Sequence, residues 1–226
     1  MDIQLVVFDV DGTLTKHSSV WWRLHEHFGT TVEGKRYYDQ YFAGDITYDQ
    51  WADLDAALWK GNSIDEVMKI VHATKLTPGS EITIQTLREH GLKTAILSGG
   101  LDVMANDISQ RVGIDYVLTN KLHHKDGILT GLVDNNVAWG GKADEIHLIN
   151  EYFGIPLEKT AFVGDGRNDI SVFEVVGFSI AFNPEHQDVA NAASVVIHND
   201  DLRAILPHLI PEFLQLEGQI HTPGEE

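Results

Sequence analysis

Nearly continuous apolar runs, each ending in a short polar or glycine-rich segment, set the pattern of hydrophobic positions along the chain. They span residues 3–8, 92–97, 160–163 and 178–182. Runs of this kind are typical of parallel strands buried on both faces. Between them lie stretches of helical periodicity that end at a glycine, namely 80–90 before Gly91, 142–153 before Gly154 and 169–176 before Gly177. The alternation predicts an α/β fold with a doubly wound, Rossmann-like parallel sheet.

Two segments interrupt this alternation. Residues 16–76 show mainly helical periodicity and hold four of the five tryptophans, which predicts a small helical cap inserted between core segments 1–15 and 77–226. We call residues 16–76 the cap segment. Farther along, the strand-like runs 116–124 and 128–133 flank Lys125-Asp126-Gly127. Asp-Gly between two such runs predicts a β-hairpin insertion.

Composition narrows the class of protein. With 226 residues and 43% hydrophobic content, the chain has the length for one substantial core and a smaller subdomain. Its longest apolar runs are far shorter than the ~20 residues of a membrane span, and the first residues lack the layout of a signal peptide. The absence of cysteine excludes disulfides, thiolate zinc sites and cysteine nucleophiles. We expect a cytoplasmic protein that does not bind membranes.

Charge limits the choice of partner. The chain has 16 basic and 34 acidic residues, a formal net charge of −18, which disfavours binding to nucleic acid or anionic membranes. The same field opposes a phosphorylated ligand. Any phosphate site therefore needs local positive charge from a metal ion, a lysine or a set of backbone N–H groups.

Chemically suggestive side chains follow three of the predicted strands. Asp9 and Asp11 follow the first, Ser98 follows the second, and Asp165 and Asp169 follow the third. A lone carboxylate after a strand is usually a helix cap or a turn residue. In an open α/β sheet, however, ligands bind at the carboxyl ends of the strands. The joint placement at three such ends therefore favours one shared site.

Four segments, in order, carry a resemblance to a known family. Residues 9–15 (DVDGTLT), residues 98–100 (SGG), Lys142 and residues 164–169 (GDGRND) are similar to the four motifs of the haloacid dehalogenase-like hydrolases. The hairpin KDGILTG and the run NDIS also resemble the phosphoserine phosphatase branch of that family. The resemblance implies a Mg²⁺-dependent phosphomonoesterase that acts through an aspartyl-phosphate on phosphoserine or a similar small phosphorylated metabolite. It leaves the oligomeric state open between monomer and homodimer.

The resemblance also implies roles for the acidic residues. Asp9 would attack phosphorus, and Asp11 would act as general acid and then as general base. The ligands of Mg²⁺ would be the Asp9 side chain, the Asp11 backbone carbonyl and Asp165, all hard oxygen donors. Asp169 would support the site from behind these ligands.

Four further residues are implied in phosphate binding: Ser98, the Gly99 amide, Lys142 and Asn168. For Ser98 the alternative is a helix N-cap, and both roles are compatible. For Lys142 the alternative is a solvated lysine in a first helical turn, but a helix N-terminus is a poor place for a cation, so we expect an anionic partner. Asn168 would hold the loop or a metal-bound water. Two interpretations of Arg167 stay open, a surface residue or a second phosphate contact.

Substrate specificity is expected to depend on the cap segment. In the phosphoserine branch a glutamate soon after the nucleophile holds the substrate amine, and an arginine in the cap holds its carboxylate. When this sequence is aligned with that branch without gaps, Ser18 falls at the first of these positions and Asp55 at or near the second. Another cation would then have to hold a carboxylate, and the candidates are Arg23, Lys35, Arg36 and Lys60. The natural substrate stays open.

The cap segment is rich in aromatic residues: Trp21, Trp22, Trp51, Trp59, Tyr37, Tyr38 and Tyr41. They either line a pocket or form the core of a small helical bundle, and we favour the core for most of them. The histidines, including the adjacent His123 and His124, show no metal-ligand spacing and are interpreted as surface or ordinary core residues.

Other functions compete with a phosphomonoesterase. A phosphomutase shares the aspartyl-phosphate but returns the phosphoryl group to a sugar, and product analysis separates the two. A catalytically silent binding module is disfavoured because every candidate catalytic residue is present. A dehalogenase is disfavoured further, since it has no use for a metal-binding Asp165.

Overall fold

The computed structural model describes residues 2–16, 19–210 and 213, so Ser18 lies outside the described residues. Within them the chain forms a seven-stranded sheet in the order β4-β3-β2-β1-β5-β6-β7. The strands are β1 (Leu5–Phe8), β2 (Lys93–Leu101), β3 (Tyr116–Lys125), β4 (Ile128–Asp134), β5 (Thr160–Gly164), β6 (Phe178–Phe182) and β7 (Val195–Ile197). Neighbouring strands pair in parallel, except that β4 is antiparallel to β3.

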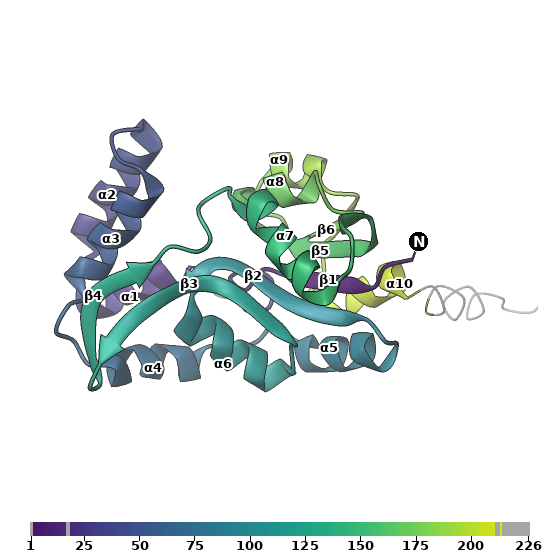
Figure 1. Ribbon diagram of the computed structural model, residues 1–226, viewed down its shortest axis with the longest axis horizontal. Helices are drawn as coiled ribbons and strands as arrows, with labels where there is room; N and C mark the ends of the chain where they lie inside the picture. The colour runs from purple at the N-terminus through teal and green to yellow at the C-terminus, as the bar shows by residue number, and fades with distance from the viewer. Residues whose placement is uncertain (1, 17–18, 211–212, 214–226) are drawn as a thin grey trace, which may run out of the picture.

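Helices cover both faces of the sheet (Figure 1). One face packs against α5 (Ser80–Glu89), α6 (Asp102–Val112) and α10 (Leu206–Leu209), and the other against α7 (Lys142–Phe153), α8 (Ile170–Phe173) and α9 (Gln187–Ala192). Short 3₁₀ turns add η1 (Leu157–Lys159), η2 (Arg167–Asp169) and η3 (Leu202–Ile205). Successive side chains of β1 enter opposite cores, since Val6 belongs to the first and Val7 to the second. The predicted doubly wound α/β sheet is confirmed.

The cap segment forms consecutive helices: α1 (Val20–Phe28), α2 (Thr31–Ala43), α3 (Tyr48–Leu58) and α4 (Ile64–Ala73). Figure 1 shows α2 and α3 side by side, projecting away from the sheet, while α4 lies next to α6. The chain returns to the core through an antiparallel bridge between Thr15 and Leu76. The limits of this segment as a separate domain stay a prediction. None of the described helices is long and apolar enough to cross a bilayer.

The β3–β4 hairpin is a continuation of the core strand β3. The first half of β3 pairs in parallel with β2, and its second half turns back into β4. Asp126 (φ 51°) and Gly127 (φ 79°) are both left-handed, as a tight two-residue hairpin turn requires. The hairpin also supports the cap segment, because the Gly61 N–H donates to the Leu129 carbonyl at 3.0 Å and the Ile64 N–H to the Gly127 carbonyl at 2.9 Å.

Some boundaries differ from the predicted ones. The helix expected over 169–176 is a 3₁₀ turn followed by α8, which ends at Phe173, because the Asp169 side chain binds the backbone before it and tightens the first turn. Strand β2 continues through Ser98 to Leu101 instead of ending at Leu97. Strand β7 was not predicted, since three residues are too few to show a pattern.

Candidate active site

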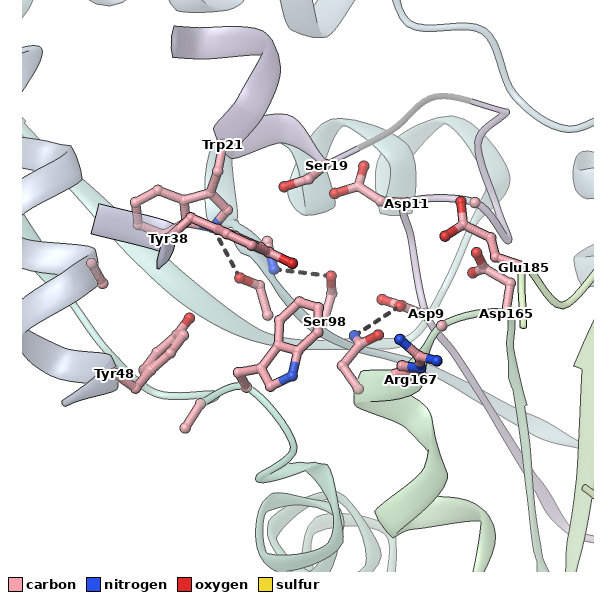
Figure 2. Close-up of a pocket in the computed structure, with 18 of the residues that line it drawn as sticks. Asp9, Asp11, Ser19, Trp21, Tyr38, Tyr48, Ser98, Asp165, Arg167 and Glu185 are labelled. Carbon is pink, nitrogen blue, oxygen red and sulfur yellow. Dashed lines mark hydrogen bonds between the residues drawn. The ribbon is translucent and has the colours of Figure 1, made fainter. Parts of the chain in front are cut away.

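The carboxyl ends of β1, β2 and β5 open into one pocket of about 510 Å³. Because these strands are adjacent and parallel, the predicted residues Asp9, Asp11, Ser98 and Asp165 all line it, together with Asn168 (Figure 2). The structure therefore gathers the candidates from three distant segments at one edge of the sheet. Gly99 lines the pocket too, and its contact with phosphate stays a prediction.

Asp9 is the residue that directly follows β1, and it is almost fully buried. Its Oδ1 accepts the Val10 N–H at 2.7 Å, while Oδ2 lies 2.9 Å from Lys142 Nζ. Asn168 Nδ2 approaches the same Oδ2 at 3.5 Å. The carboxylate is thus held in one orientation beside the cavity by a backbone donor and a cation.

Lys142 is the first residue of α7, and its side chain is only 1% exposed. Its Nζ lies 2.5 Å from Asp169 Oδ1 as well as close to Asp9. Burial lowers the pKa of Lys142, but the neighbouring Asp169 and Asp9 outweigh burial and raise that pKa above its ordinary value. The interpretation as a solvated lysine is wrong, and the expected anionic partners are these two carboxylates.

Three carboxylates cluster beside this lysine. Oxygens of Asp9, Asp165 and Asp169 lie within 4.8 Å of one another. Burial, followed by the charges of Asp169 and Asp9, raises the pKa of Asp165 to about 9. One lysine does not balance three buried acids, and a divalent cation with oxygen ligands fits the remaining negative charge. Among the described residues this is the group of side chains suited to hold a metal.

Asp165 and Asp169, the two acids of the fourth motif, each have defined hydrogen-bond partners. Asp169 Oδ2 accepts the N–H groups of Asp165 and Gly166, both at 3.0 Å, while its Oδ1 faces Lys142. Burial raises the pKa of Asp169, and the ion pair with Lys142 opposes that rise. The Thr13 hydroxyl donates to Asp165 Oδ1 at 2.8 Å, which leaves the second Asp165 oxygen free of side-chain partners among the described residues.

Gly12 allows the first loop to approach Asp165. Its φ is +85°, and a Cβ added there would lie 2.0 Å from Asp165 Oδ2. Any other residue would both strain this backbone and displace the carboxylate. The close approach of residues 9–15 to residues 164–169 therefore depends on Gly12.

The Asp11 carboxyl has one buried oxygen without a hydrogen-bond partner among the described residues. Its Oδ2 accepts the Val20 N–H at 3.0 Å, whereas the buried Oδ1 has no hydrogen-bond partner among the described residues. Burial raises the pKa of Asp11 to about 7, with a further rise from Asp9 and opposition from the Val20 N–H. A carboxyl with this pKa can both give and take a proton near neutral pH.

Ser98 is buried within the extended β2, and its Oγ accepts the Gly100 N–H at 3.1 Å. The interpretation of Ser98 as a helix N-cap is wrong, because Leu101 occupies that position of α6 and no side chain caps the helix. The Gly99 carbonyl accepts from Trp21 Nε1 at 3.0 Å, a contact visible in Figure 2. This bond fixes the Ser98-Gly99-Gly100 segment against the cap segment.

A family model for the haloacid dehalogenase-like hydrolases matches residues 6–174, which include all of these core residues. The chain belongs to this family. It is 34% identical over 207 residues to the phosphoserine phosphatase of Methanocaldococcus jannaschii, covering 91% of this chain and 97% of that relative. It is 31% identical to the phosphoserine phosphatase of Wolinella succinogenes, covering 92% and 100%. Against phosphoserine phosphatase SerB2 of Mycobacterium tuberculosis the identity is 32%, and the chain spans 47% of that longer protein.

Solved structures agree with these relatives. One described as a phospho-aspartyl intermediate analogue of phosphoserine phosphatase has a TM-score of 0.78 and 33% identity, covering 92% of this hydrolase and 100% of that chain. A substrate-bound phosphoserine phosphatase complex also gives a TM-score of 0.78, with 33% identity and coverage of 92% and 99%. The predicted resemblance to this branch of the family is confirmed.

Asn120 is a residue of this hydrolase that sequence reasoning missed. It is fully buried at the end of the core half of β3, and its Nδ2 donates to the Gly99 carbonyl at 3.0 Å and to Tyr48 Oη at 2.9 Å. It also exchanges two hydrogen bonds with the Val137 backbone, at 2.8 and 3.1 Å. A single asparagine forms no sequence pattern, and the available signal was its position in the middle of a predicted strand.

The recognition residues expected in the cap segment are not assembled around the pocket. Asp55 does line it, 3% exposed, with Oδ1 3.2 Å from His25 Nε2. Burial raises the Asp55 pKa and His25 opposes the rise. The four candidate cations do not line the pocket, and three of them have other partners: Arg23 donates to Thr74 Oγ1 at 2.6 Å, Lys35 pairs with Asp39 at 2.5 Å, and Arg36 donates to Tyr37 Oη at 3.0 Å. Arg36 and Lys60 are exposed.

Aromatic rings from the cap segment line the pocket instead of filling a bundle core. Of the residues predicted to form that core, Trp59 is fully buried, whereas Trp21, Tyr38 and Trp51 line the cavity. Tyr38 and Trp51 do not occupy the favoured core position because the projecting α2–α3 pair has little interior of its own, whereas Trp21 of α1 lines the cavity and also packs against the core. The stripe Tyr48, Trp51 and Asp55 has helical spacing, which by itself does not distinguish a core face from a pocket face.

Arg167 and the histidine pair have simple placements. Arg167 is exposed and lines the pocket (Figure 2), and its Nε donates to Asp188 Oδ2 at 2.7 Å. A phosphate contact for Arg167 stays a prediction. His123 pairs with Asp134 at 2.9 Å on the hairpin, away from the acid cluster.

Proposed function

We propose that this hydrolase is a Mg²⁺-dependent phosphomonoesterase that releases phosphate from a small phosphorylated metabolite through an aspartyl-phosphate on Asp9. The observation that carries the proposal is the Asp9 carboxylate, fixed at a strand end between Lys142 and the other two acids, and open to a 510 Å³ pocket. The relatives named phosphoserine phosphatase support the same chemistry, and they make phosphoserine one of the substrates to test.

The reaction has two displacements. In the first, an Asp9 carboxylate oxygen bonds to phosphorus, the bond from phosphorus to the leaving oxygen breaks, and Asp11 gives that oxygen its proton. In the second, Asp11 takes a proton from water as the water oxygen bonds to phosphorus, and the bond to Asp9 breaks to release phosphate. The unpaired Oδ1 of Asp11 and its pKa of about 7 support both proton transfers.

The acid cluster suits a divalent cation. We propose the Asp9 side chain, the Asp165 side chain and the Asp11 backbone carbonyl as ligands, and Mg²⁺ as the ion because every donor is an oxygen. When bound, the ion supplies the positive charge that lets a carboxylate approach a phosphate dianion. Asp169, with both oxygens engaged, orients Asp165 and Lys142, and Lys142 adds a cation beside the reacting group. Ser98, Gly99 and Asn168 are proposed to contact the phosphate.

Further proposals concern the cap domain, the compartment and the oligomeric state. We propose that residues 16–76 act as the cap domain over the pocket and that the protein works in the cytoplasm as a monomer or homodimer. The absence of cysteine fits a reducing compartment.

The test is phosphate release by wild type, Asp9→Asn and the control Asp144→Asn, in which the exposed Asp144 of α7 loses the same charge outside the site. With Mg²⁺, wild type and control should release phosphate from p-nitrophenyl phosphate, and Asp9→Asn should not. EDTA should stop the reaction and Mg²⁺ should restore it. Near-normal turnover by Asp9→Asn would contradict covalent catalysis, and transfer of phosphate to a sugar instead of water would indicate a mutase.

A further inference from the structure

One end of the pocket has walls of aromatic rings. We call it the ring chamber, and it is formed by Trp21, Tyr38, Phe42, Tyr48, Trp51 and Trp139. Figure 2 shows Trp21, Tyr38 and Tyr48 on one side of Ser98, with Asp165 and Arg167 on the other. Since the phosphate is expected near Asp9 and Ser98, the ring chamber is where the leaving alcohol would lie.

Several of these rings meet at steep angles, although Tyr38 and Phe42 are tilted by 42° with centroids 4.5 Å apart. Trp51 lies at 85° to Tyr38, with centroids 5.7 Å apart, and at 83° to Tyr48, with centroids 6.0 Å apart. Phe42 and Trp139 also meet at 85°, at 5.6 Å, across the boundary between cap segment and core. A planar ligand ring would need parallel walls, whereas walls at right angles surround a compact, rounded group. A tetrahedral ammonium in contact with several ring faces has this shape.

A buried carboxylate also lines the same pocket. Asp55 is 3% exposed, and its Oδ1 makes no hydrogen bond although it lies 3.2 Å from His25 Nε2. His25 Nδ1 lies 2.8 Å from the Thr30 hydroxyl, which accepts from Trp59 Nε1 at 3.3 Å. When that hydroxyl donates to Nδ1, His25 is a neutral ring with its hydrogen on Nε2. His25 then does not neutralise Asp55, and because burial raises the pKa of that carboxyl, a cation bound beside it would favour its charged form.

Among the described residues, the lysine and arginine side chains that line this pocket are paired with aspartates of the core. Its lining includes Lys16, held by Asp200 at 3.1 Å, and Arg167, held by Asp188 at 2.7 Å. Lys16 follows the nucleophile loop, and both aspartates belong to the core. A carboxylate in the ring chamber would therefore meet ring faces and the Asp55 charge, both of which disfavour an anion. A cation would be favoured by both.

We propose that the substrate is the phosphate ester of an ammonium-bearing alcohol without a carboxylate, of the phosphocholine type, and that the ring chamber and Asp55 bind the ammonium group. This inference rests on the proposed phosphomonoesterase activity. It differs from a phosphoserine assignment in the charge of the leaving group, since serine brings a carboxylate as well as an amine.

The experiment compares kcat/KM for phosphocholine, phosphoserine, 2-phenylethyl phosphate and 3,3-dimethylbutyl phosphate, the uncharged carbon isostere of phosphocholine. We expect phosphocholine to exceed the isostere by about 10-fold or more, the size of a desolvated cation–π contact, and to exceed phosphoserine as well. Equal values for phosphocholine and either neutral ester would overturn the inference. Phosphoserine as the better substrate would overturn it too.

Two variants and a control locate the effect. Asp55→Asn and Trp51→Leu should each reduce the ratio of kcat/KM between phosphocholine and its isostere several-fold. Asp53→Asn should leave that ratio unchanged, because Asp53 is exposed on the same helix and outside the pocket lining. If all three variants keep the wild-type ratio, Asp55 and the rings do not bind the ammonium.

A binding measurement makes the inference independent of turnover. Choline should quench the tryptophan fluorescence of the full chain at concentrations about 10-fold lower than 3,3-dimethylbutan-1-ol. If the protein does not release phosphate from p-nitrophenyl phosphate in the presence of Mg²⁺, the proposed function is wrong. Choline binding then still tests whether the ring chamber binds an ammonium group. If release occurs but choline and its isostere bind equally, only the present inference fails.

Discussion

The two ends of the pocket are built in opposite ways. At the phosphate end, Asp9, Lys142 and Asp169 are buried charged groups within hydrogen-bonding distance of one another, and they are mounted on strand ends and a helix start. At the other end the walls are rings from α1, α2 and α3 together with Trp139 of the core, and Tyr38 and Phe42 are about half exposed. The first arrangement fixes reacting groups in place. The second arrangement selects leaving groups by their shape and charge, and its side chains take no part in making or breaking bonds.

The largest expected effect comes from removing the cation of the phosphate end. Lys142→Met keeps the length of the side chain but leaves Asp9 and Asp169 buried without their shared partner. Breaking a buried ion pair in this way costs about 3–5 kcal/mol. We expect the free energy of unfolding, measured by urea denaturation, to fall by that amount, and phosphate release to become undetectable.

A matched control for this variant is Lys159→Met. Lys159 pairs with Asp2 at 2.8 Å at the exposed surface, so the same substitution there should leave stability and activity nearly unchanged. Comparable losses in the two variants would show that the buried triad of Asp9, Lys142 and Asp169 has no special role.

Asp11→Asn should slow the reaction next most strongly. The asparagine keeps an oxygen for the Val20 N–H and the backbone carbonyl proposed as a metal ligand, but it has no proton to transfer. A positioned acid contributes ~10²–10⁴-fold, and an alkyl phosphate needs it in both steps. With p-nitrophenyl phosphate we expect a burst of nitrophenolate and then a stalled phosphoprotein that hydroxylamine cleaves.

The outcome that argues against this role is equal slowing of both substrates with no trapped phosphoprotein. Asp11 would then serve only to hold the start of α1 through Val20. Asp45→Asn, at an exposed position after α2, is the control for loss of an acidic side chain.

The contrast between the two ends also explains what the sequence could predict. Asp9, Asp165 and Lys142 lie in short motifs at strand ends, so their chemistry and their meeting point follow from the topology of a parallel sheet. Trp51 lies on a helical stripe that equally suits a core, and its role depends on what α3 faces. The partnership of Asn120 with Gly99 joins residues far apart in sequence, and local patterns do not encode such a contact.

Asn120 links the two ends and gives a prediction of intermediate size. Asn120→Leu leaves the buried Val137 N–H without its acceptor and frees Tyr48 from β3, although Trp21 still donates to the Gly99 carbonyl. We expect a loss of about 1–3 kcal/mol in the free energy of unfolding and a several-fold lower kcat/KM.

The control for Asn120 is Asn136→Leu, which removes an exposed amide that donates to the Thr119 carbonyl at 3.0 Å. It should have little effect on either measurement. If Asn120→Leu changes stability but keeps the wild-type kcat/KM for every ester, Asn120 is a packing residue and does not position the Ser98-Gly99-Gly100 segment.

The smallest expected effect separates the stability of the cap segment from its part in binding. Thr47 caps α3: its hydroxyl accepts the Gln50 N–H at 3.2 Å, and Gln50 Oε1 accepts the Thr47 N–H at 2.9 Å. Ser63 caps α4 in a similar way, accepting the Asp65 N–H at 3.1 Å. Removing either hydroxyl with alanine should cost about 1 kcal/mol, the usual size of an N-cap.

The two N-capped helices, α3 and α4, differ in whether their residues line the pocket. Helix α3 presents Tyr48, Trp51 and Asp55 to the ring chamber, whereas no residue of α4 lines the pocket. Thr47→Ala should therefore raise KM for the preferred ester and leave kcat nearly constant, since fraying of the first turn displaces Tyr48 but not Asp9. Ser63→Ala should lower the thermal unfolding midpoint by about as much as Thr47→Ala does, but it should not change KM. An equal rise in KM for both variants would mean that the cap segment responds as one rigid unit, and that binding is sensitive to its overall stability instead of to the rings of α3.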